Sequence, residues 1–147
     1  MKGILCKTIK VVMINLVMTK LVLFNKALAD ATRWRIVSLV TDEALCICEL
    51  ADILEMPQST ISSHVQIIRK AGLLESEKCE KWTYFRIDKK YLRLIRSMSL
   101  LFAEPEDPSW KDDARKAQQR LAQREDSCCP GPQNLSPRKK TQTKTLS

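Results

Sequence analysis

The pattern of apolar and polar positions between residues 46 and 72 predicts two consecutive helices joined by a sharp turn. Pro57 separates them, because proline disfavours a helical residue before it but suits the first turn of a new helix. Gly72 can end the second helix in a left-handed conformation. The apolar positions, at the spacing of amphipathic helices, are Ile47, Leu50, Ala51 and Leu54 in the first helix and Ile61, Val65 and Ile68 in the second.

The outward face of the second helix is rich in short hydrogen-bonding side chains. Serine and threonine are mediocre helix formers, so crowding them there lowers helical stability more than an ordinary solvated face requires. Such a face can approach base edges and phosphates closely, and we therefore predict that it contacts DNA. The candidate contacts on this helix are Gln58, Ser59, Thr60, Ser62, Ser63, His64 and Arg69.

Apolar periodicity predicts further helices over residues 15–28, 31–40 and 91–102. Alternation over residues 82–87 instead predicts a strand with one buried face, and it forms a hairpin with residues 73–78. Lys78 and Lys81 at the hairpin tip are candidate phosphate contacts. Since a hairpin directly after a recognition helix is a wing, the expected fold is mainly α with a small β-hairpin, a winged helix-turn-helix.

The first and last helices of this domain have apolar stripes that a three-helix head with a wing cannot easily cover. We therefore expect a homodimer formed by these two helices, with two-fold symmetry. Such a dimer would hold its recognition helices about 34 Å apart, for successive major grooves of operator DNA. The alternative is that both helices complete a monomeric core.

The composition divides the 147 residues into three parts. We expect residues 1–15 to be an N-terminal extension that can be disordered, residues 16–103 to be the DNA-binding domain, and residues 104–147 to be a polar, partly helical C-terminal tail that carries a cysteine pair. Within this tail we expect a helix over residues 113–126 and a mobile segment after it, with Arg138 and its neighbouring lysines as solvated charges.

The formal charge of +8 sits mainly at the ends of the chain. Residues 1–29 hold five lysines and no acidic residue, whereas residues 30–103 hold 11 basic and 10 acidic residues. DNA binding would therefore depend on local basic patches, to which Lys70 and Arg86 could add, and it would weaken steeply with salt.

The N-terminus imitates a signal peptide, with an apolar run followed by Ala27-Leu28-Ala29. Lys20 interrupts the run and Asn15 weakens it, so we expect no 18-residue apolar span, no membrane partner and a cytoplasmic protein. Met13 or Met18 could be the natural start, which would make residues 1–12 an extension of the core.

Several motifs, in order, resemble the ArsR/SmtB winged-helix repressors over residues 18–103. They are Leu28-Ala29-Asp30 with Thr32-Arg33 and Arg35-Ile36, then LCICEL, QSTISSHV, KAGLL and WTYFRI. The resemblance is closest to the arsenical-resistance operon repressors, which carry a Cys-x-Cys like Cys46-Ile47-Cys48. It implies a homodimer that occupies an operator and leaves it when a thiophilic ion binds. The chain departs from the family pattern at Ala31, at Ala51, where a third cysteine is frequent, and at Cys79-Glu80 in the wing turn.

Cys46 and Cys48 supply two soft ligands, whereas As(III) or Sb(III) prefers three sulfurs. On a regular helix, positions i and i+2 point about 200° apart, so the pair can share an ion only at a helix start or through distortion. We expect ion binding to fray or tilt this helix and to move the recognition helix. The alternative is that both cysteines pack as small hydrophobic residues.

The third ligand is open between the C-terminal pair, Cys128 and Cys129, and the N-terminal Cys6. The pair resembles that of some arsenic-responsive relatives, and Cys6 resembles the N-terminal cysteines of cadmium and lead sensors. Cys79, at the wing tip, is expected to be a bystander.

His64 is the only histidine, so the last helix lacks the histidines of a zinc site and no Cys-His enzyme is indicated. A structural hydrogen bond beneath the helix remains open for His64, beside a DNA contact. The sequence thus predicts a non-enzymatic repressor released from DNA by arsenite or antimonite. The alternatives are a repressor responsive to cadmium, lead or zinc or to thiol oxidation, and a dimeric interaction module that no longer binds DNA.

Overall fold

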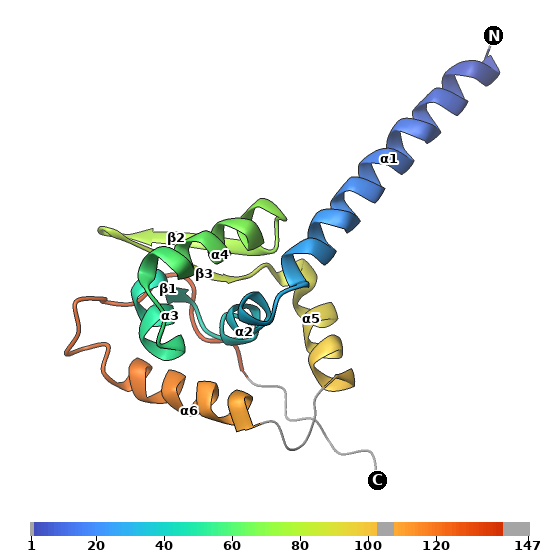
Figure 1. Cartoon of the computed structure of the whole chain (residues 1–147). Helices are drawn as coiled ribbons and strands as arrows, with labels where there is room; N and C mark the ends of the chain where they lie inside the picture. The colour runs from blue at the N-terminus through green and yellow to red at the C-terminus, as the bar shows by residue number, and fades with distance from the viewer. Residues whose placement is uncertain (1, 103–107, 140–147) are drawn as a thin grey trace.

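The computed structural model of the chain describes residues 2–102 and 108–139, with side chains described for residues 8–102 and 111–139. In these ranges helices surround a small antiparallel sheet, and the long first helix projects away from the rest of the molecule (Figure 1). The elements in chain order are α1 (Lys2–Leu28), α2 (Ala31–Leu39), β1 (Leu45–Cys46), α3 (Ile47–Leu54), α4 (Gln58–Lys70), β2 (Leu74–Cys79), β3 (Trp82–Ile87), α5 (Lys89–Leu101) and α6 (Pro108–Ala122).

The predicted helix-turn-helix is present as α3 and α4. Glu55 ends α3 in a left-handed conformation with φ 54°, and Gln58 opens α4 directly after Pro57. Gly72 follows α4 with φ 76°, which confirms the predicted left-handed exit. The chain therefore turns sharply twice, once before and once after the recognition helix.

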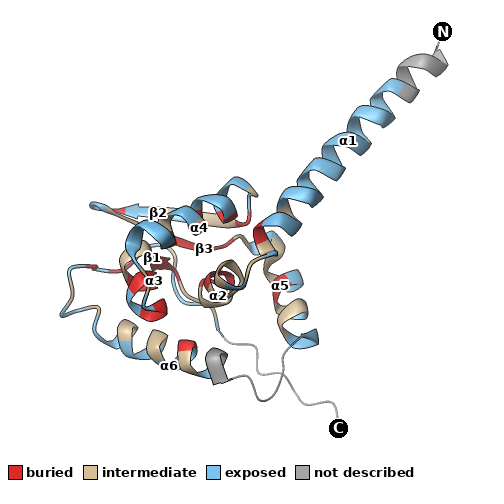
Figure 2. Ribbon diagram, viewed as in Figure 1, coloured by how far each residue is buried: buried red, intermediate tan, exposed pale blue. Residues whose placement is uncertain are grey.

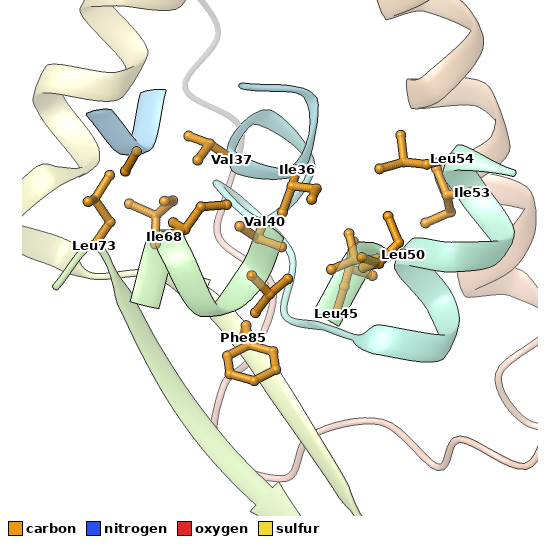
Figure 3. Close-up of a cluster of buried hydrophobic side chains, with 14 of the residues drawn as sticks. Ile36, Val37, Val40, Leu45, Leu50, Ile53, Leu54, Ile68, Leu73 and Phe85 are labelled. Carbon is orange, nitrogen blue, oxygen red and sulfur yellow. The ribbon is translucent and has the colours of Figure 1, made fainter. Parts of the chain in front are cut away.

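The core lies where α2, α3 and α4 meet, and it fixes the position of α4 (Figure 3). Ile61, Val65 and Ile68 of α4 are fully buried, as the apolar spacing predicts. Complete burial of one such side chain stabilises the fold by roughly 1.5–3 kcal/mol. Labelled neighbours in this cluster are Ile36, Val37, Val40, Leu45, Leu50, Ile53, Leu54, Leu73 and Phe85.

The wing is part of a three-stranded sheet with the order β1-β3-β2. The sequence pattern did not predict β1, a two-residue strand that pairs Cys46 with Tyr84. The expectation that β3 has one buried face is wrong, because Tyr84 and Arg86 are buried as well as Phe85 and Ile87. Gly131 and Ser136, near the C-terminal end of the described chain, cover the face of Tyr84 and Arg86.

Helix α1 begins at Lys2 rather than near Asn15, and it is exposed along most of its length (Figure 2). The expectation of no long apolar span is wrong, since Thr8–Leu28 is long and apolar enough to cross a membrane, with a mean hydropathy of 1.6 over 18 residues. Lys20 and Asn15 do not outweigh the valines, leucines and methionines around them. One such helix near an N-terminus is weak evidence of a membrane span, because signal sequences pass the same test.

Helix α5 also presents apolar side chains to solvent. Of its predicted stripe only Ile95 is buried, whereas Leu101 and Phe102 at its end are 78% and 75% exposed. Phe24 of α1 contacts Tyr91 of α5, with ring centroids 5.5 Å apart. The two helices that the sequence marked as insufficiently covered are thus adjacent to each other and remain exposed.

The polar C-terminal part packs onto the domain. The predicted helix is present as α6, which lies against α2 and α3 (Figure 1). Residues 127–139, here called the C-terminal segment, run past the sheet, and the expectation that they are mobile is wrong because Cys129 is fully buried among them. Arg138 is not a solvated charge either, since it donates to Thr41, Ile87 and Glu75. Lys140 lies outside the described residues.

Candidate functional site

The candidate DNA-reading face is the outward side of α4. Gln58, Ser59, Thr60, Ser63 and Arg69 are exposed there. The Ser63 hydroxyl donates to the Ser59 carbonyl at 3.0 Å, which leaves its oxygen free to accept a further hydrogen bond. These small side chains keep the helix surface low, as close approach to a DNA groove requires.

Two further candidate contacts on α4 are less accessible. Ser62 and His64 are half-buried, and His64 Nδ1 lies 3.8 Å from Asp30 Oδ1. Asp30 caps α2 by accepting from the Arg33 backbone N–H at 2.9 Å. That hydrogen bond holds the pKa of Asp30 below its ordinary value and outweighs desolvation, which raises the pKa, so the carboxylate facing His64 is charged. The structure therefore places His64 beside Asp30 without a hydrogen bond to its Nδ1 among the described residues, and both the structural hydrogen bond and the DNA contact stay predictions.

The wing tip carries the two lysines predicted to contact phosphates. Lys78 and Lys81 are exposed, and Lys81 Nζ lies 4.6 Å from the centroid of the Trp82 ring. Arg86, by contrast, is buried and pairs with Glu75 at 2.7 Å. The expectation that Arg86 adds to a basic patch is therefore wrong, because its charge is used inside the fold.

Three cysteine sulfurs converge where β1 meets α3. The Sγ atoms of Cys46, Cys48 and Cys129 all lie within 4.8 Å of one another. Cys46 Sγ is 3.6 Å from Cys129 Sγ. Cys46 and Cys129 are buried and Cys48 is half-buried, so the cluster is largely shielded from solvent.

The position of the Cys-x-Cys at the start of α3 allows both of its sulfurs to point to the same place. Cys46 is the N-cap, with an extended backbone at φ −88° and ψ 171°, and Cys48 is in the first turn. The two side chains therefore escape the 200° separation of a regular helix. The pair thus uses a helix start, one of the two geometries that we expected, because the sulfurs are close while α3 is intact. The expectation that ion binding frays or tilts α3 stays a prediction.

The other cysteines differ in how close they lie to the three grouped sulfurs. Cys128 is exposed and its sulfur lies 3.8 Å from that of Cys129, outside the three-sulfur group. Cys79 is buried in the same apolar cluster as Cys46 and Cys129, so it is not remote from the pair as expected, although it is not one of the three grouped sulfurs. The side chain of Cys6 lies outside the described residues.

A buried ion pair closes the cluster from the other side. Glu49 of α3 is fully buried, and its Oε1 lies 2.7 Å from Arg124 Nε. Glu49 Oε2 also accepts from the Cys46 backbone N–H at 3.1 Å, and Arg124 donates to the Ala44 carbonyl at 2.6 Å. One carboxylate thus holds both the Cys46 backbone and Arg124, which lies two residues after the end of α6.

The surroundings favour neutral thiols in the absence of an ion. Burial, as the largest cause, raises the pKa of Cys46 well above its ordinary value and that of Cys129 to about 11. Burial likewise raises the pKa of Tyr84, whose hydroxyl oxygen accepts from the Gly131 N–H at 2.8 Å, to about 12. Three soft sulfurs at this spacing can take up a thiophilic ion, which displaces the protons of the Cys46 and Cys129 thiols.

Sequence reasoning missed Glu49, Arg124 and Tyr84 as supporting residues. A glutamate three residues after a helix start is the capping-box position, so Glu49 had a readable signal. Nothing local in the sequence pairs Arg124 with Glu49, because they are 75 residues apart.

Residues 30–76 match the family described as "Bacterial regulatory protein, arsR family". The chain is 36% identical over 88 residues to the arsenic resistance transcriptional regulator ArsR1 of Pseudomonas putida, which covers 59% of this chain and 56% of that protein. It is 36% identical over 73 residues to the uncharacterized HTH-type regulator MJ1325 of Methanocaldococcus jannaschii, covering 48% and 82%. It is 35% identical over 78 residues to the cadmium resistance regulatory protein CadC of Listeria innocua, covering 52% and 64%. The chain thus spans little more than half the length of ArsR1.

Two solved structures share the fold. HlyU from Vibrio cholerae matches with a TM-score of 0.55 and 26% identity, over 59% of this chain and 96% of that one. The homodimeric winged helix-turn-helix domain of Mb0332 from Mycobacterium bovis matches with a TM-score of 0.56 and 23% identity, over 59% and 82%. The predicted winged helix-turn-helix is therefore confirmed.

Together, the fold and the relatives define a winged-helix transcription regulator. The chain belongs to the arsR family of bacterial regulatory proteins. That is a family of regulators rather than of enzymes, which confirms the expectation of a non-enzymatic protein.

Proposed function

We propose that this protein is a cytoplasmic transcriptional repressor that leaves its operator when arsenite or antimonite binds Cys46, Cys48 and Cys129. The observation that carries the proposal is the convergence of these three sulfurs within 4.8 Å. A pyramidal trivalent ion prefers three soft ligands, and arsenic resistance appears in the name of the relative ArsR1.

The proton balance suits arsenite. Neutral As(OH)₃ and three thiols form three As–S bonds and break three As–O bonds, and the thiol protons leave within three water molecules. No net proton is released. A divalent cation such as Cd²⁺ instead displaces protons into solution, so its binding to protonated thiols weakens as the pH falls.

The ion site lies directly behind the DNA-reading helix. Cys46 and Cys48 are at the start of α3, which packs against α4 and leads into it through Glu55, Met56 and Pro57. Drawing the sulfurs around one ion shifts the start of α3 against the C-terminal segment, and α3 passes this shift to α4. A shift of the recognition helix weakens its fit to the groove.

We propose that the protein binds DNA as a homodimer through α1 and α5. Leu21 of α1 and Leu94 of α5 are 51% and 46% exposed, and burying such surface favours association. The related fold of Mb0332 is described as homodimeric. Two-fold symmetry would present the two α4 helices to successive major grooves.

The test is operator binding of the purified protein, measured by fluorescence anisotropy with and without arsenite. Arsenite should weaken binding by roughly 5–150-fold, the usual range of allosteric coupling. Cys46→Ser, Cys48→Ser and Cys129→Ser should each abolish the response and lower arsenite affinity by more than about 100-fold. Cys128→Ser is the matched control and should retain both, with sulfur-to-arsenic charge-transfer absorbance as the readout of ion binding. Full arsenite release in Cys129→Ser would contradict the ligand set.

A soft divalent ion is the second candidate, favoured by the nearby fourth thiol. Cys128 Sγ lies 3.8 Å from Cys129 Sγ, and CadC of Listeria innocua is named for cadmium resistance. Four sulfurs suit a tetrahedral ion. If cadmium is the inducer, its binding should depend on Cys128 and weaken as the pH falls from 8 to 6, whereas arsenite binding should change little over this range.

A further inference from the structure

The C-terminal segment is held on the wing mainly by hydrogen bonds from its backbone. Three successive backbone N–H groups, those of Gln133, Asn134 and Leu135, converge on the carboxylate of Glu77 in β2. Their donor-to-oxygen distances are 2.8, 2.9 and 2.8 Å. A set of consecutive N–H groups around one anion is a strong, directional anchor.

The charge state of Glu77 agrees with this geometry. Partial desolvation raises the pKa of its carboxyl, but the hydrogen bonds from Gln133, Leu135 and Asn134 outweigh it, so the pKa lies below its ordinary value. The carboxylate is therefore ionised, as the three donors require.

Two further contacts flank this anchor. On the side nearer the ion site, the Gly131 N–H donates to the Tyr84 hydroxyl at 2.8 Å. On the far side, the Arg138 N–H donates to the Asp42 carbonyl at 2.9 Å. The segment between Cys129 and Arg138 is thus fixed at successive points along β2, β3 and the loop after α2.

Cys129 itself depends on these contacts for its position. The hydrogen bonds of its own backbone are local, since its N–H donates to Ser127 Oγ at 3.3 Å and its carbonyl accepts from the same hydroxyl. Gln133, the first residue whose N–H donates to Glu77, is only four positions after Cys129. A stretch of this length reaches at most about 13–14 Å when extended, so fixing Gln133 confines Cys129 to the neighbourhood of Cys46.

We propose that Glu77 is a positioning residue, which anchors the C-terminal segment on the wing and thereby keeps the Cys129 sulfur within reach of Cys46 and Cys48. This proposal rests on the proposed function, in which Cys129 is the third ion ligand. Through Glu77, that ligand is attached to the wing. An ion that joins the three sulfurs then ties α3 to β2, the two elements that flank the DNA-reading helix in the sequence.

The experiment compares Glu77→Ala with Glu80→Ala, which removes the same charge from the exposed tip of the same hairpin. Both are made in a Cys128→Ser background, so that labelling within the segment reports on Cys129 alone. The first readout is the rate at which iodoacetamide alkylates Cys129 in the ion-free protein, followed by peptide mass spectrometry. The second is the dissociation constant for arsenite.

In Glu77→Ala we expect alkylation of Cys129 to be about tenfold faster and arsenite binding to be about tenfold weaker, because the third ligand must be ordered when the ion binds. Glu77→Gln keeps one neutral acceptor oxygen and should lie between the wild type and Glu77→Ala. Glu80→Ala should match the wild type. Operator affinity without ion should change little in every variant, and the unfolding midpoint of the Glu77 variants should fall only slightly, which separates positioning from a general loss of structure.

Wild-type rates of alkylation in Glu77→Ala would overturn the proposal, and so would equal effects of Glu77→Ala and Glu80→Ala. If the wild type binds no arsenite, the proposed function is wrong, but the role of Glu77 is still tested. The alkylation rates still decide whether Glu77 holds the segment, so the two failures are distinguishable.

Discussion

The two ends of the chain behave in the opposite way from what their compositions suggest. Helix α1 is apolar and basic, yet Val17 and Leu21 are 59% and 51% exposed. The C-terminal part is polar, yet it contributes Cys129, fully buried, and Asp113, 6% exposed. Figure 2 shows this contrast between the projecting α1 and the docked α6.

The difference teaches that hydropathy indicates which surfaces should be covered but does not say what covers them. The C-terminal part is held by ion pairs such as Arg35–Asp113 at 2.6 Å and by backbone hydrogen bonds, whose partners already exist in the same chain. The apolar residues of α1 find few partners within one chain. We expect a second copy to supply them.

The largest effect should come from breaking the buried charge pair that docks the C-terminal part. Arg124→Met leaves the fully buried Glu49 carboxylate without its partner, and we expect it to destabilise the protein by about 3–5 kcal/mol. Urea unfolding followed by circular dichroism measures this loss. The control is Arg115→Met, whose ion pair with Asp112 is exposed and should contribute less than about 1 kcal/mol. Similar small losses in both variants would mean that charge does not hold this end.

The second effect concerns the apolar end. Leu21→Glu should convert the dimer to a monomer, because each of the two copies loses roughly 1.5–3 kcal/mol of stabilisation from burial of this side chain. The two losses together should raise the dissociation constant of the dimer by at least about 100-fold. Sedimentation equilibrium measures this constant. Thr19→Glu, on the opposite side of the helix, is the control and should remain dimeric. An unchanged dimer in Leu21→Glu would show that α1 is not covered by a second copy.

The smallest effect is a pH dependence confined to the polar end. Because the pKa of Glu77 in the folded protein lies below its ordinary value of 4.5, its contribution to stability is fully present above pH 4.5 and is lost as the pH falls through the lower folded value. The stability difference between the wild type and Glu77→Gln should therefore be constant from pH 7 to 5 and shrink below pH 4.5. Urea unfolding at each pH measures it, and a difference that grows on acidification would contradict the assigned anchor.

The parts of the fold that could be predicted from the sequence are those that repeat locally. Ile61, Val65 and Ile68 lie one helical turn apart, and each is buried for the reason that the spacing indicates. The left-handed exit at Gly72 follows from the missing side chain. These features need only a few neighbouring residues to be recognised.

The parts that could not be predicted depend on pairing between distant segments. Tyr84 and Arg86 alternate with apolar residues and therefore indicate a solvent-facing side, but the C-terminal segment covers them. Its docking uses backbone N–H groups, which every residue carries and which leave no mark in the sequence. For the same reason the Cys-x-Cys was recognisable as a candidate ligand pair, whereas the grouping of Cys129 rather than Cys128 with it required the structure.

The distance of 83 residues between Cys46 and Cys129 has a consequence during synthesis. At about 5–20 residues per second, the ribosome adds Cys129 roughly 4–17 s after Cys46. By that time the whole winged helix has been translated and can begin to fold. Under the function proposed above, a newly made molecule would be able to bind DNA before it could bind the ion.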